Sequence, residues 1–211
     1  MSKALVISID SLFTSDIDYI KELPNFKRIL NDSSIVKNIN CIYPTLTYPC
    51  HTSIITGVYP NKHKISHNEK FQPYSKTSDW YWYSKDIGVD SIIDIAKANN
   101  LKTSTILWPV SGGCSADYNI AEIWTKEKDE DLFEVFNNSS TKELMETIYP
   151  KYSHIIKWNS EPHLDEFGVC CAEDIITTYK PDLMLIHLAY LDHTVAAGVD
   201  RVVRLVPGLR E

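Results

Sequence analysis

Long hydrophobic runs are missing from this chain of 211 residues. A membrane-spanning helix needs roughly 18 or more consecutive apolar residues, and no stretch approaches that length. The N-terminal segment Met1–Asp10 contains a short apolar run without the cleavage region of a secretory signal peptide. We therefore expect a globular protein without a membrane partner, located in the cytoplasm.

Cysteine is scarce, and its spacing fits neither of its common structural uses. The five cysteines are an odd number, include the adjacent Cys170 and Cys171, and contain no Cys-x-x-Cys pair. Disulfide frameworks use even sets of cysteines, and many structural zinc sites use Cys-x-x-Cys pairs. The sequence thus favours free, mostly buried thiols in a reducing compartment.

Positive charge is also in short supply. The chain has 21 Lys and Arg against 28 Asp and Glu, which gives a net charge of −7. A nucleic-acid-binding protein generally needs a basic face, so the composition argues against that class. A nucleotide substrate stays compatible, because a bound metal ion can supply local positive charge. The hydrophobic fraction of 44% is sufficient for the core of one domain or of one large part of a domain.

Residues 43–51 hold two threonines and a proline just before a predicted helix start at Cys50 to Ile55. A hydroxyl at such a place lies near unpaired backbone N–H groups and the positive end of the helix dipole, which favour a bound anion such as phosphate. Thr is also a preferred N-cap residue, so Thr47 could simply cap the helix. The local chemistry leaves both interpretations open.

The longer pattern is more specific. Pro-Thr-Leu-Thr-Tyr-Pro-x-His (44–51) is followed by Thr-Gly-x-Tyr-Pro (56–60), and then by x-His-x-Ile and Asn68. Together these motifs resemble the type I phosphodiesterase/nucleotide pyrophosphatase family, which belongs to the alkaline phosphatase superfamily. The resemblance implies that Thr47 is the metal-bound nucleophile and that Asn68 helps to hold a phosphate oxygen. Cys50 and Lys64 stand where the family usually has Asn and Gly.

The resemblance also implies two divalent metal ions, zinc by family. Asp10 and Asp192 each follow an apolar run and match metal-binding aspartates of the family, although Asp10 alone would equally suit a turn or a helix cap. Ala196 stands where the family has a metal-binding histidine, and the remaining family ligands would lie beyond residue 211. We therefore expect an incomplete site, with Asp10 and Thr47 at one ion and Asp192 at the other.

Short apolar runs alternate with segments of helical spacing along the chain. The predicted strands are residues 3–9, 34–42, 103–108 and 182–188. The predicted helices are residues 17–30, restarted at Pro24, 90–99 and 165–179. This alternation predicts an α/β fold with a mostly parallel sheet flanked by helices, alkaline-phosphatase-like by resemblance. Because parallel strands share a carboxyl edge, Asp10, Thr47 and Asp192 should meet there, with Asn68 nearby.

The resemblance gives a domain division. Residues 1–194 are expected to form the N-terminal part of an alkaline-phosphatase-like catalytic domain, truncated at its C-terminus, with about 126–160 as a cap insertion. Residues 195–211 do not continue the family pattern, and three of the four arginines of the chain fall after residue 200. We expect this segment to be an atypical tail that packs poorly, either a natural tail or a non-native extension.

The aromatic segment 69–86 and His187 each allow two interpretations from the sequence. The aromatic residues between 69 and 86 could stack on a base or sugar, or could pack as a surface hairpin. His187 alternates with apolar neighbours, which predicts a core histidine rather than a metal ligand.

The leading hypothesis is metal-dependent hydrolysis of phosphodiester or nucleotide pyrophosphate bonds in a small-molecule substrate, with Thr47 as nucleophile. Because the metal site implied by the resemblance is incomplete, we expect little of this activity from the 211-residue chain itself. One alternative is another hydrolase of the superfamily that acts on phosphonates or phosphomonoesters. A sulfatase is disfavoured because Cys50 does not start a Cys-x-Pro-x-Arg motif. The other alternative is a non-catalytic fragment that binds phosphate or a nucleotide.

Overall fold

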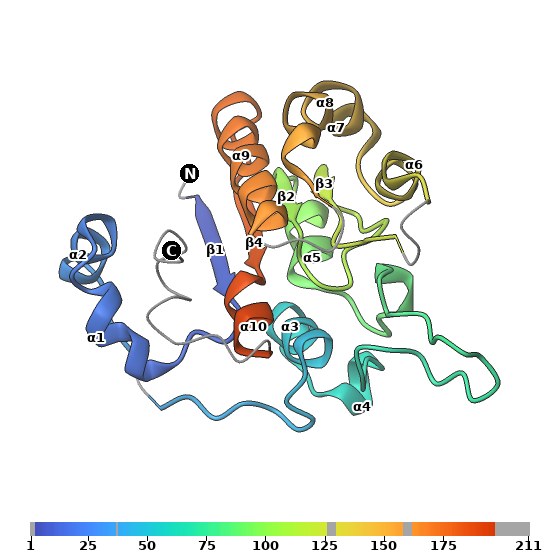
Figure 1. The fold of residues 1–211 in the computed structure, drawn as a ribbon, viewed down its shortest axis with the longest axis horizontal. Helices are drawn as coiled ribbons and strands as arrows, with labels where there is room; N and C mark the ends of the chain where they lie inside the picture. Colours follow the sequence, from blue (N-terminus) through green and yellow to red (C-terminus); the bar gives the residue numbers. More distant parts are fainter. Residues whose placement is uncertain (1–2, 37, 126–129, 158–161, 197–211) are drawn as a thin grey trace.

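A computed structural model describes residues 3–36, 38–125, 130–157 and 162–196 (Figure 1). Its four strands form one sheet in the order β1-β4-β2-β3, and every neighbouring pair is parallel. The strands are β1 (Ala4–Ile9), β2 (Thr103–Ile106), β3 (Tyr118–Ile120) and β4 (Leu183–Leu188). The predicted α/β fold with a mostly parallel sheet is confirmed.

Helices connect the strands. The α-helices are α1 (Ile17–Ile20), α2 (Pro24–Asn31), α3 (Thr47–Thr56), α4 (Pro60–His63), α5 (Ile92–Ala98), α6 (Leu132–Asn137), α7 (Lys142–Thr147), α8 (Tyr149–Tyr152), α9 (His163–Thr178) and α10 (Tyr190–Ala196). The 3-10 helices are η1 (Thr14–Asp16), η2 (Ser84–Asp86) and η3 (Ser153–Ile155). The predicted helices at 17–30, 90–99 and 165–179 are confirmed by α1 with α2, by α5 and by α9.

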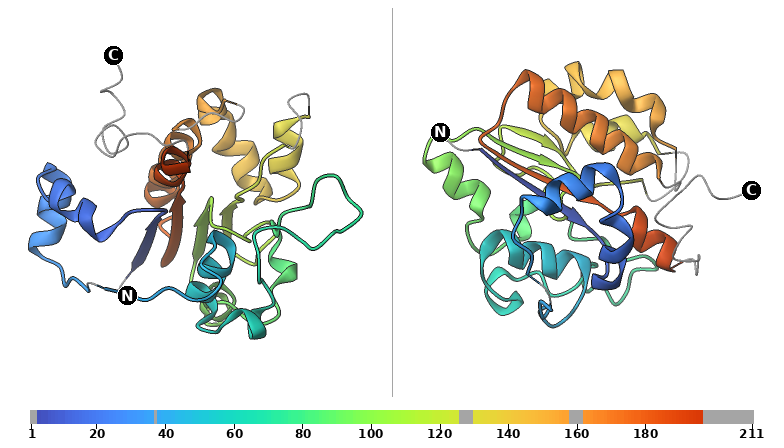
Figure 2. Two further views of the ribbon diagram at one scale, coloured as in Figure 1. Left: turned by 60° about the horizontal axis from the view of Figure 1, so that its bottom comes forward. Right: turned by 90° about the vertical axis from the view of Figure 1, so that its left-hand side faces the viewer.

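The sheet separates two hydrophobic cores. Met184 and Ile186 of β4 belong to the larger core, which includes buried residues of α9, whereas Leu183 and Leu185 belong to a smaller core with residues of α3 and α5. Successive side chains of a strand point to opposite faces. Figure 2 shows α7, α8 and α9 on one side of the sheet and α3 and α5 on the other. Burial on both faces explains why β4 appears as a continuous apolar run in the sequence.

Local signals in the sequence set the ends of several helices. Pro24 occupies the first turn of α2, where its missing N–H group costs nothing. The Ser91 side chain accepts a hydrogen bond from the Asp94 amide and caps α5. Gly57 ends α3 with φ +68°, a left-handed conformation that glycine adopts without steric cost.

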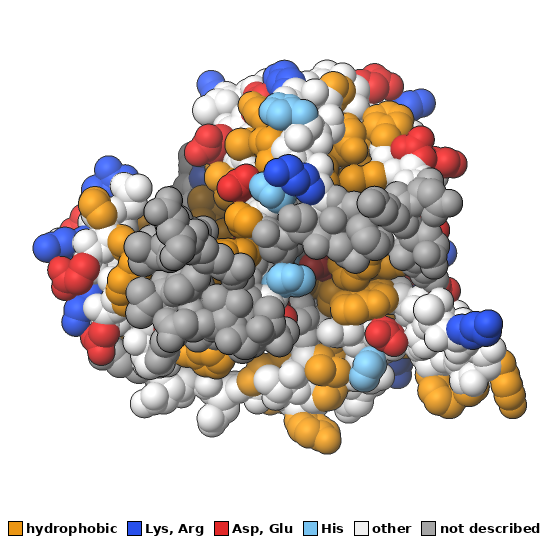
Figure 3. Space-filling model, viewed as in Figure 1, with side chains coloured by type: hydrophobic (Ala, Val, Ile, Leu, Met, Phe, Trp, Pro, Cys, Tyr) orange, Lys and Arg blue, Asp and Glu red, His pale blue; other side chains and the backbone are white. Residues whose placement is uncertain are grey.

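The predicted strand at residues 34–42 is wrong. The described residues of this segment adopt no strand conformation, and Asn38 has φ +61°, which interrupts an extended backbone. Val36 and Ile39 are 75% and 78% exposed. An apolar run becomes a strand only where a neighbouring strand and a core cover it, and no described strand pairs with this run. Hydrophobic side chains reach the surface at several separate points of the face in Figure 3.

Strand β3 was not predicted, because it has only three residues and includes the polar Asn119. Strand β2 is shorter than predicted, since Leu107 turns the chain with φ +51°. Within the predicted cap insertion, 126–160, α7 contacts β3 and α8 contacts α9. The predicted tail, 195–211, lies outside the described residues except for the end of α10.

Strand β1 lies at an edge of the sheet and pairs with β4. Leu5 and Ile7 on this strand are 50% and 52% exposed. Within the described ranges, the helices are all too short or too polar to span a membrane.

Candidate active site

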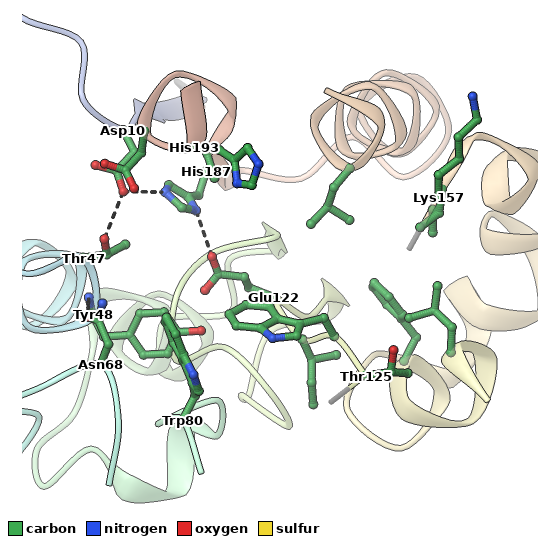
Figure 4. A pocket seen from close by; sticks show the side chains of 18 residues that line it. Asp10, Thr47, Tyr48, Asn68, Trp80, Glu122, Thr125, Lys157, His187 and His193 are labelled. Carbon is green, nitrogen blue, oxygen red and sulfur yellow. Dashed lines mark hydrogen bonds and ion pairs between the residues drawn. The ribbon is translucent and has the colours of Figure 1, made fainter. Parts of the chain in front are cut away.

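A pocket of about 250 Å³ lies beyond the carboxyl ends of β1 and β4 (Figure 4). Asp10 follows β1 directly, Asp192 belongs to α10 after β4, and Thr47 is the first residue of α3. These three residues and Asn68 all line the pocket. The structure therefore brings the four predicted site residues together at the edge where open α/β sheets bind ligands. Their chemical roles stay predictions.

Thr47 faces the first carboxylate. Its hydroxyl donates a hydrogen bond of 3.1 Å to Asp10 Oδ2. The N-cap position of α3 is Leu46, whose side chain makes no capping hydrogen bond. The alternative that Thr47 merely caps the helix is therefore wrong. The Tyr48 amide donates to Asn68 Oδ1 at 3.0 Å, which leaves the Asn68 amide nitrogen as a donor beside Thr47.

Ser11 joins the two predicted metal-binding carboxylates. Its backbone N–H donates to Asp10 Oδ1 at 2.9 Å, and its hydroxyl donates to Asp192 Oδ1 at 2.6 Å. Ser11 has φ +55°, in the left-handed region. Glycine adopts this conformation without steric cost, whereas other residues adopt it uncommonly.

His187 is buried, as predicted, but it also lines the pocket. Its Nε2 lies 3.6 Å from Asp10 Oδ2, and its Nδ1 lies 3.3 Å from Glu122 Oε1. Burial alone would lower the pKa of His187, but the contacts with both carboxylates outweigh it and raise the pKa to about 10. An imidazolium between two carboxylates is therefore the form expected at neutral pH.

Asp10 is held in its ionised form. Its burial acts to raise the pKa, but the contact with His187, the charges of His187 and His51 and the hydrogen bond from Thr47 act in the other direction. The net effect is a lowered pKa for the Asp10 carboxyl. An ionised Asp10 can accept the Thr47 hydroxyl hydrogen, which polarises that hydroxyl.

His51 fixes the first turn of α3, a role that the sequence analysis missed. Its Nδ1 lies 2.7 Å from the Thr47 carbonyl oxygen, and its Nε2 lies 2.8 Å from Ser8 Oγ on β1. Burial, followed by the charge of His187, lowers the pKa of His51 to about 4. The four-residue spacing from Thr47 was a signal that could have placed His51 one helical turn away.

Asp165 positions α10, a role that no sequence pattern indicated. Its two carboxylate oxygens accept the N–H groups of Ala189 at 2.9 Å and Tyr190 at 3.0 Å. These bonds fix the start of the helix that carries Asp192. Burial is the main cause of the raised pKa of Asp165.

Aromatic side chains form one wall of the pocket. The rings of Tyr48 and Trp80 are 5.3 Å apart, and those of Trp80 and Trp124 are 4.9 Å apart, both edge to face. Trp80 thus brings the aromatic segment 69–86 to the pocket, whereas Phe71 is 90% exposed. Trp80 packs in the wall of the pocket and Phe71 is exposed, so the choice between stacking on a base or sugar and packing as a surface hairpin stays a prediction.

The donors present in the pocket do not complete a zinc site. Asp10 and Thr47 offer one carboxylate and one hydroxyl to one ion, and Asp192 lies beside them through Ser11. Zinc takes about four ligands, commonly including nitrogen or sulfur. Over the described ranges, no group of three or more His, Cys, Asp and Glu residues is arranged to hold a metal ion.

The fold is similar to that of solved hydrolases. Phosphonoacetate hydrolase from Sinorhizobium meliloti superimposes with a TM-score of 0.64 at 16% identity, over 91% of this chain and 47% of that protein. Murine ectonucleotide pyrophosphatase/phosphodiesterase 5 gives a TM-score of 0.58 at 19% identity, over 96% of this chain and 48% of that protein. The chain thus spans about half the length of each, and these likenesses show the fold.

Sequence comparison leads to a family. Ectonucleotide pyrophosphatase/phosphodiesterase family member 1 from Homo sapiens is 30% identical over 126 residues, which are 56% of this chain and 12% of that protein. Human bis(5'-adenosyl)-triphosphatase ENPP4 is 24% identical over 116 residues, 51% of this chain and 24% of that protein. The family model for type I phosphodiesterase / nucleotide pyrophosphatase matches residues 4–195. The chain belongs to the type I phosphodiesterase/nucleotide pyrophosphatase family of the alkaline phosphatase superfamily.

Proposed function

We propose that the protein hydrolyses phosphodiester or nucleotide pyrophosphate bonds, with Thr47 as nucleophile. The observation that carries this proposal is the hydrogen bond from the Thr47 hydroxyl to Asp10, at a helix start that opens into a pocket. Membership of the family supports it. A bare threonine hydroxyl is a weak nucleophile, and a neighbouring carboxylate is one way to activate it.

The reaction takes two steps. The Thr47 oxygen attacks phosphorus, its proton moves toward Asp10, and the bond from phosphorus to the leaving alcohol or phosphate breaks. Water then attacks the phosphorus of the threonine ester and restores the hydroxyl. The donors placed for the phosphoryl oxygens are the Thr47 backbone N–H and the Asn68 amide nitrogen. The next N–H groups of α3 do not serve, because the Tyr48 N–H bonds to Asn68 Oδ1, Pro49 has none, and the Cys50 N–H bonds to the Leu46 carbonyl oxygen.

The family resemblance adds two divalent ions, zinc by expectation, with Asp10, Thr47 and Asp192 as the ligands that this chain supplies. Divalent ions would place positive charge beside the phosphoryl oxygens. The described residues alone do not complete such a site. For that reason, the second candidate is a fragment that binds phosphate or a nucleotide without turnover.

A nucleotide is the first small-molecule substrate to test. A threonine-to-alanine variant of murine ectonucleotide pyrophosphatase/phosphodiesterase 5, described as inactive, is known in complex with AMP. A cytoplasmic location, supported by five free thiols, is part of the proposal. So is the division into a domain part, 1–194, and a tail, 195–211.

The experiment compares Thr47→Ala with Thr45→Ala in the hydrolysis of the p-nitrophenyl ester of thymidine 5'-phosphate, with and without added Zn²⁺. Thr45 is exposed and bonds to the Ile42 carbonyl, so its replacement is a matched control. We expect Thr47→Ala to abolish turnover and Thr45→Ala to retain it. Undiminished turnover by Thr47→Ala would reject the nucleophile, and binding of AMP without any turnover by the original chain would favour the second candidate.

A further inference from the structure

Glu122 is a buried carboxylate in the same pocket, and neither the family motifs nor the proposed reaction uses it. Its side chain lines the pocket and is 7% exposed. Its Oε1 lies 3.3 Å from His187 Nδ1, but its Oε2 has no hydrogen-bond partner among the described residues. A buried carboxylate oxygen without a donor is costly, which makes such an atom rare unless a ligand satisfies it.

The protein groups nearby do not satisfy this oxygen. His187 Nδ1 faces both Glu122 Oε1 and the Leu107 carbonyl oxygen, which lies 3.2 Å away. The Tyr48 hydroxyl points toward the carboxylate in Figure 4, and burial together with the contact to Glu122 raises the pKa of Tyr48, but the two groups do not reach hydrogen-bond geometry in the described part of the chain. Two unsatisfied polar groups therefore stand side by side in the wall of a cavity.

The position of Glu122 relates it to the reacting bond. His187 lies between Glu122 and Asp10 and contacts each of them through one ring nitrogen. Thr47 donates a hydrogen bond to the same Asp10 carboxylate. The imidazole ring of His187 therefore lies between Glu122 and the carboxylate that contacts the proposed nucleophile. A donor that reaches Glu122 must stand within a few bonds of a phosphorus atom at Thr47. The aromatic rings of Trp80 and Trp124 line the pocket there.

We propose that Glu122 is a specificity residue, which accepts a hydrogen bond from an N–H or O–H group on the organic part of the substrate. This inference rests on the proposed function and names its substrate class. The substrate is a phosphodiester whose organic group carries a donor close to phosphorus, as nucleosides and aminoalkyl groups do. Esters with hydrocarbon or nitroaryl groups alone leave Oε2 unsatisfied, and an extra carboxylate or phosphate at this point is repelled.

The test uses three p-nitrophenyl phosphodiesters that share one leaving group. Bis(p-nitrophenyl) phosphate lacks the donor, the thymidine 5'-phosphate ester carries nucleoside donors, and the phosphoethanolamine ester carries an ammonium group. The variants are Glu122→Leu, which removes the acceptor at similar volume, and Glu122→Gln, which removes the charge. Glu134→Gln, an exposed carboxylate on α6, is the control for net charge.

Glu122→Leu should lower kcat/KM about tenfold or more for at least one donor-bearing ester, because a site built to bind a donor is left unpaired without it. The value for bis(p-nitrophenyl) phosphate should stay within about threefold, since the organic groups of this ester make no such bond. Glu122→Gln should fall between the two. The ester that loses more identifies the nucleoside or the ammonium group as the donor. Equal losses on all three esters would assign Glu122 to holding His187 alone and overturn the proposal, as would no loss on any.

If the original chain hydrolyses none of the esters, the proposed function fails, and binding decides this inference separately. Titration calorimetry with AMP and with phenyl phosphate compares a ligand that has donors with one that has none. Weaker binding of AMP alone by Glu122→Leu supports the specificity role. Unchanged binding of both, or equal weakening of both, overturns it, provided that circular dichroism shows the variant folded.

Discussion

The sulfur atoms of Cys41 and Cys50 lie 3.1 Å apart. Cys50 belongs to α3, less than one turn after Thr47, and Cys41 belongs to the exposed segment that leads into this helix. A disulfide needs its sulfur atoms at about 2.05 Å, so a small movement of the segment would allow a bond.

This contact predicts one oxidation site among the five thiols. With excess oxidised glutathione, the thiolate of exposed Cys41 should attack it, and Cys50 should then displace glutathione from the mixed disulfide. Burial and the neighbouring Cys41 sulfur raise the pKa of Cys50 to about 12, so Cys50 is the less ready attacking thiol. Intact mass should fall by about 2 Da as two hydrogens pass to two glutathione molecules.

Cys41→Ser should prevent that loss of mass, whereas Cys114→Ser should leave it unchanged, since Cys114 is the matched control. Lasting glutathione adducts on Cys41 without the loss of mass would show that the two sulfur atoms do not reach each other in solution.

Metal analysis should find at most one weakly bound ion per chain. The described pocket gives one or two protein oxygens to each ion, and water must fill the other positions. The measurement is elemental analysis after dialysis against buffer with micromolar Zn²⁺, beside Asp10→Asn as the control. Two stoichiometric zinc ions would mean that residues outside the described ranges complete the site.

The stability of the metal-free protein should be highest near pH 6.5. His51 has its pKa lowered from 6.5 to about 4, so the unfolded chain binds more protons between these values and stability rises with pH there. His187 has its pKa raised from 6.5 to about 10, so the folded chain binds more protons between these values and stability falls with pH there. Each limb should amount to a few kcal/mol, at about 1.4 kcal/mol per pKa unit.

Urea unfolding at a series of pH values measures both limbs. His187→Gln should flatten the alkaline limb, because it removes the group that titrates there. A free energy of unfolding that stays constant between pH 6.5 and pH 10 would contradict the arrangement of His187 between two carboxylates.

Helix α9 should tolerate change on its outer face and not on its inner face. Phe167 is fully buried and contacts the rings of Phe136 and Tyr149, so Phe167→Ala should destabilise the protein by about 3–5 kcal/mol. Val169 on the same helix is 40% exposed, and Val169→Ala should cost much less. Chemical denaturation of both variants makes the comparison, and similar losses would contradict the packing of α9 on the sheet.

The sequence predicted a strand correctly where burial on both faces of the sheet imposes an apolar run, as in β4. The same signal misled at 34–42, because an apolar run does not state whether another strand lies beside it. Asn119 lies in a strand of three residues, which is too short to leave a pattern. The end of strand β2 depends on the backbone angle φ of Leu107, which the amino-acid composition does not reveal.

The residues of the candidate site also fall into two groups, those that the sequence predicted and those that it did not. Asp10, Thr47, Asn68 and Asp192 were predicted because they match residues of the family motifs, and they do line one pocket. Glu122 and Asp165 were not predicted, because their contacts with His187 and Ala189 join residues that are 65 and 24 positions apart. Such pairings form only after the strands that carry them are placed, so local patterns contain no trace of them.

The exposed side of β1 has a consequence for handling the protein. The stretch Ala4–Ile9 contains neither charge nor proline, the usual features that stop one sheet from adding to another. No described strand covers its outer edge, and Leu5 and Ile7 are half exposed. Among the described residues, this edge is where a second molecule would add its own β1, and we expect aggregation of concentrated samples to begin there.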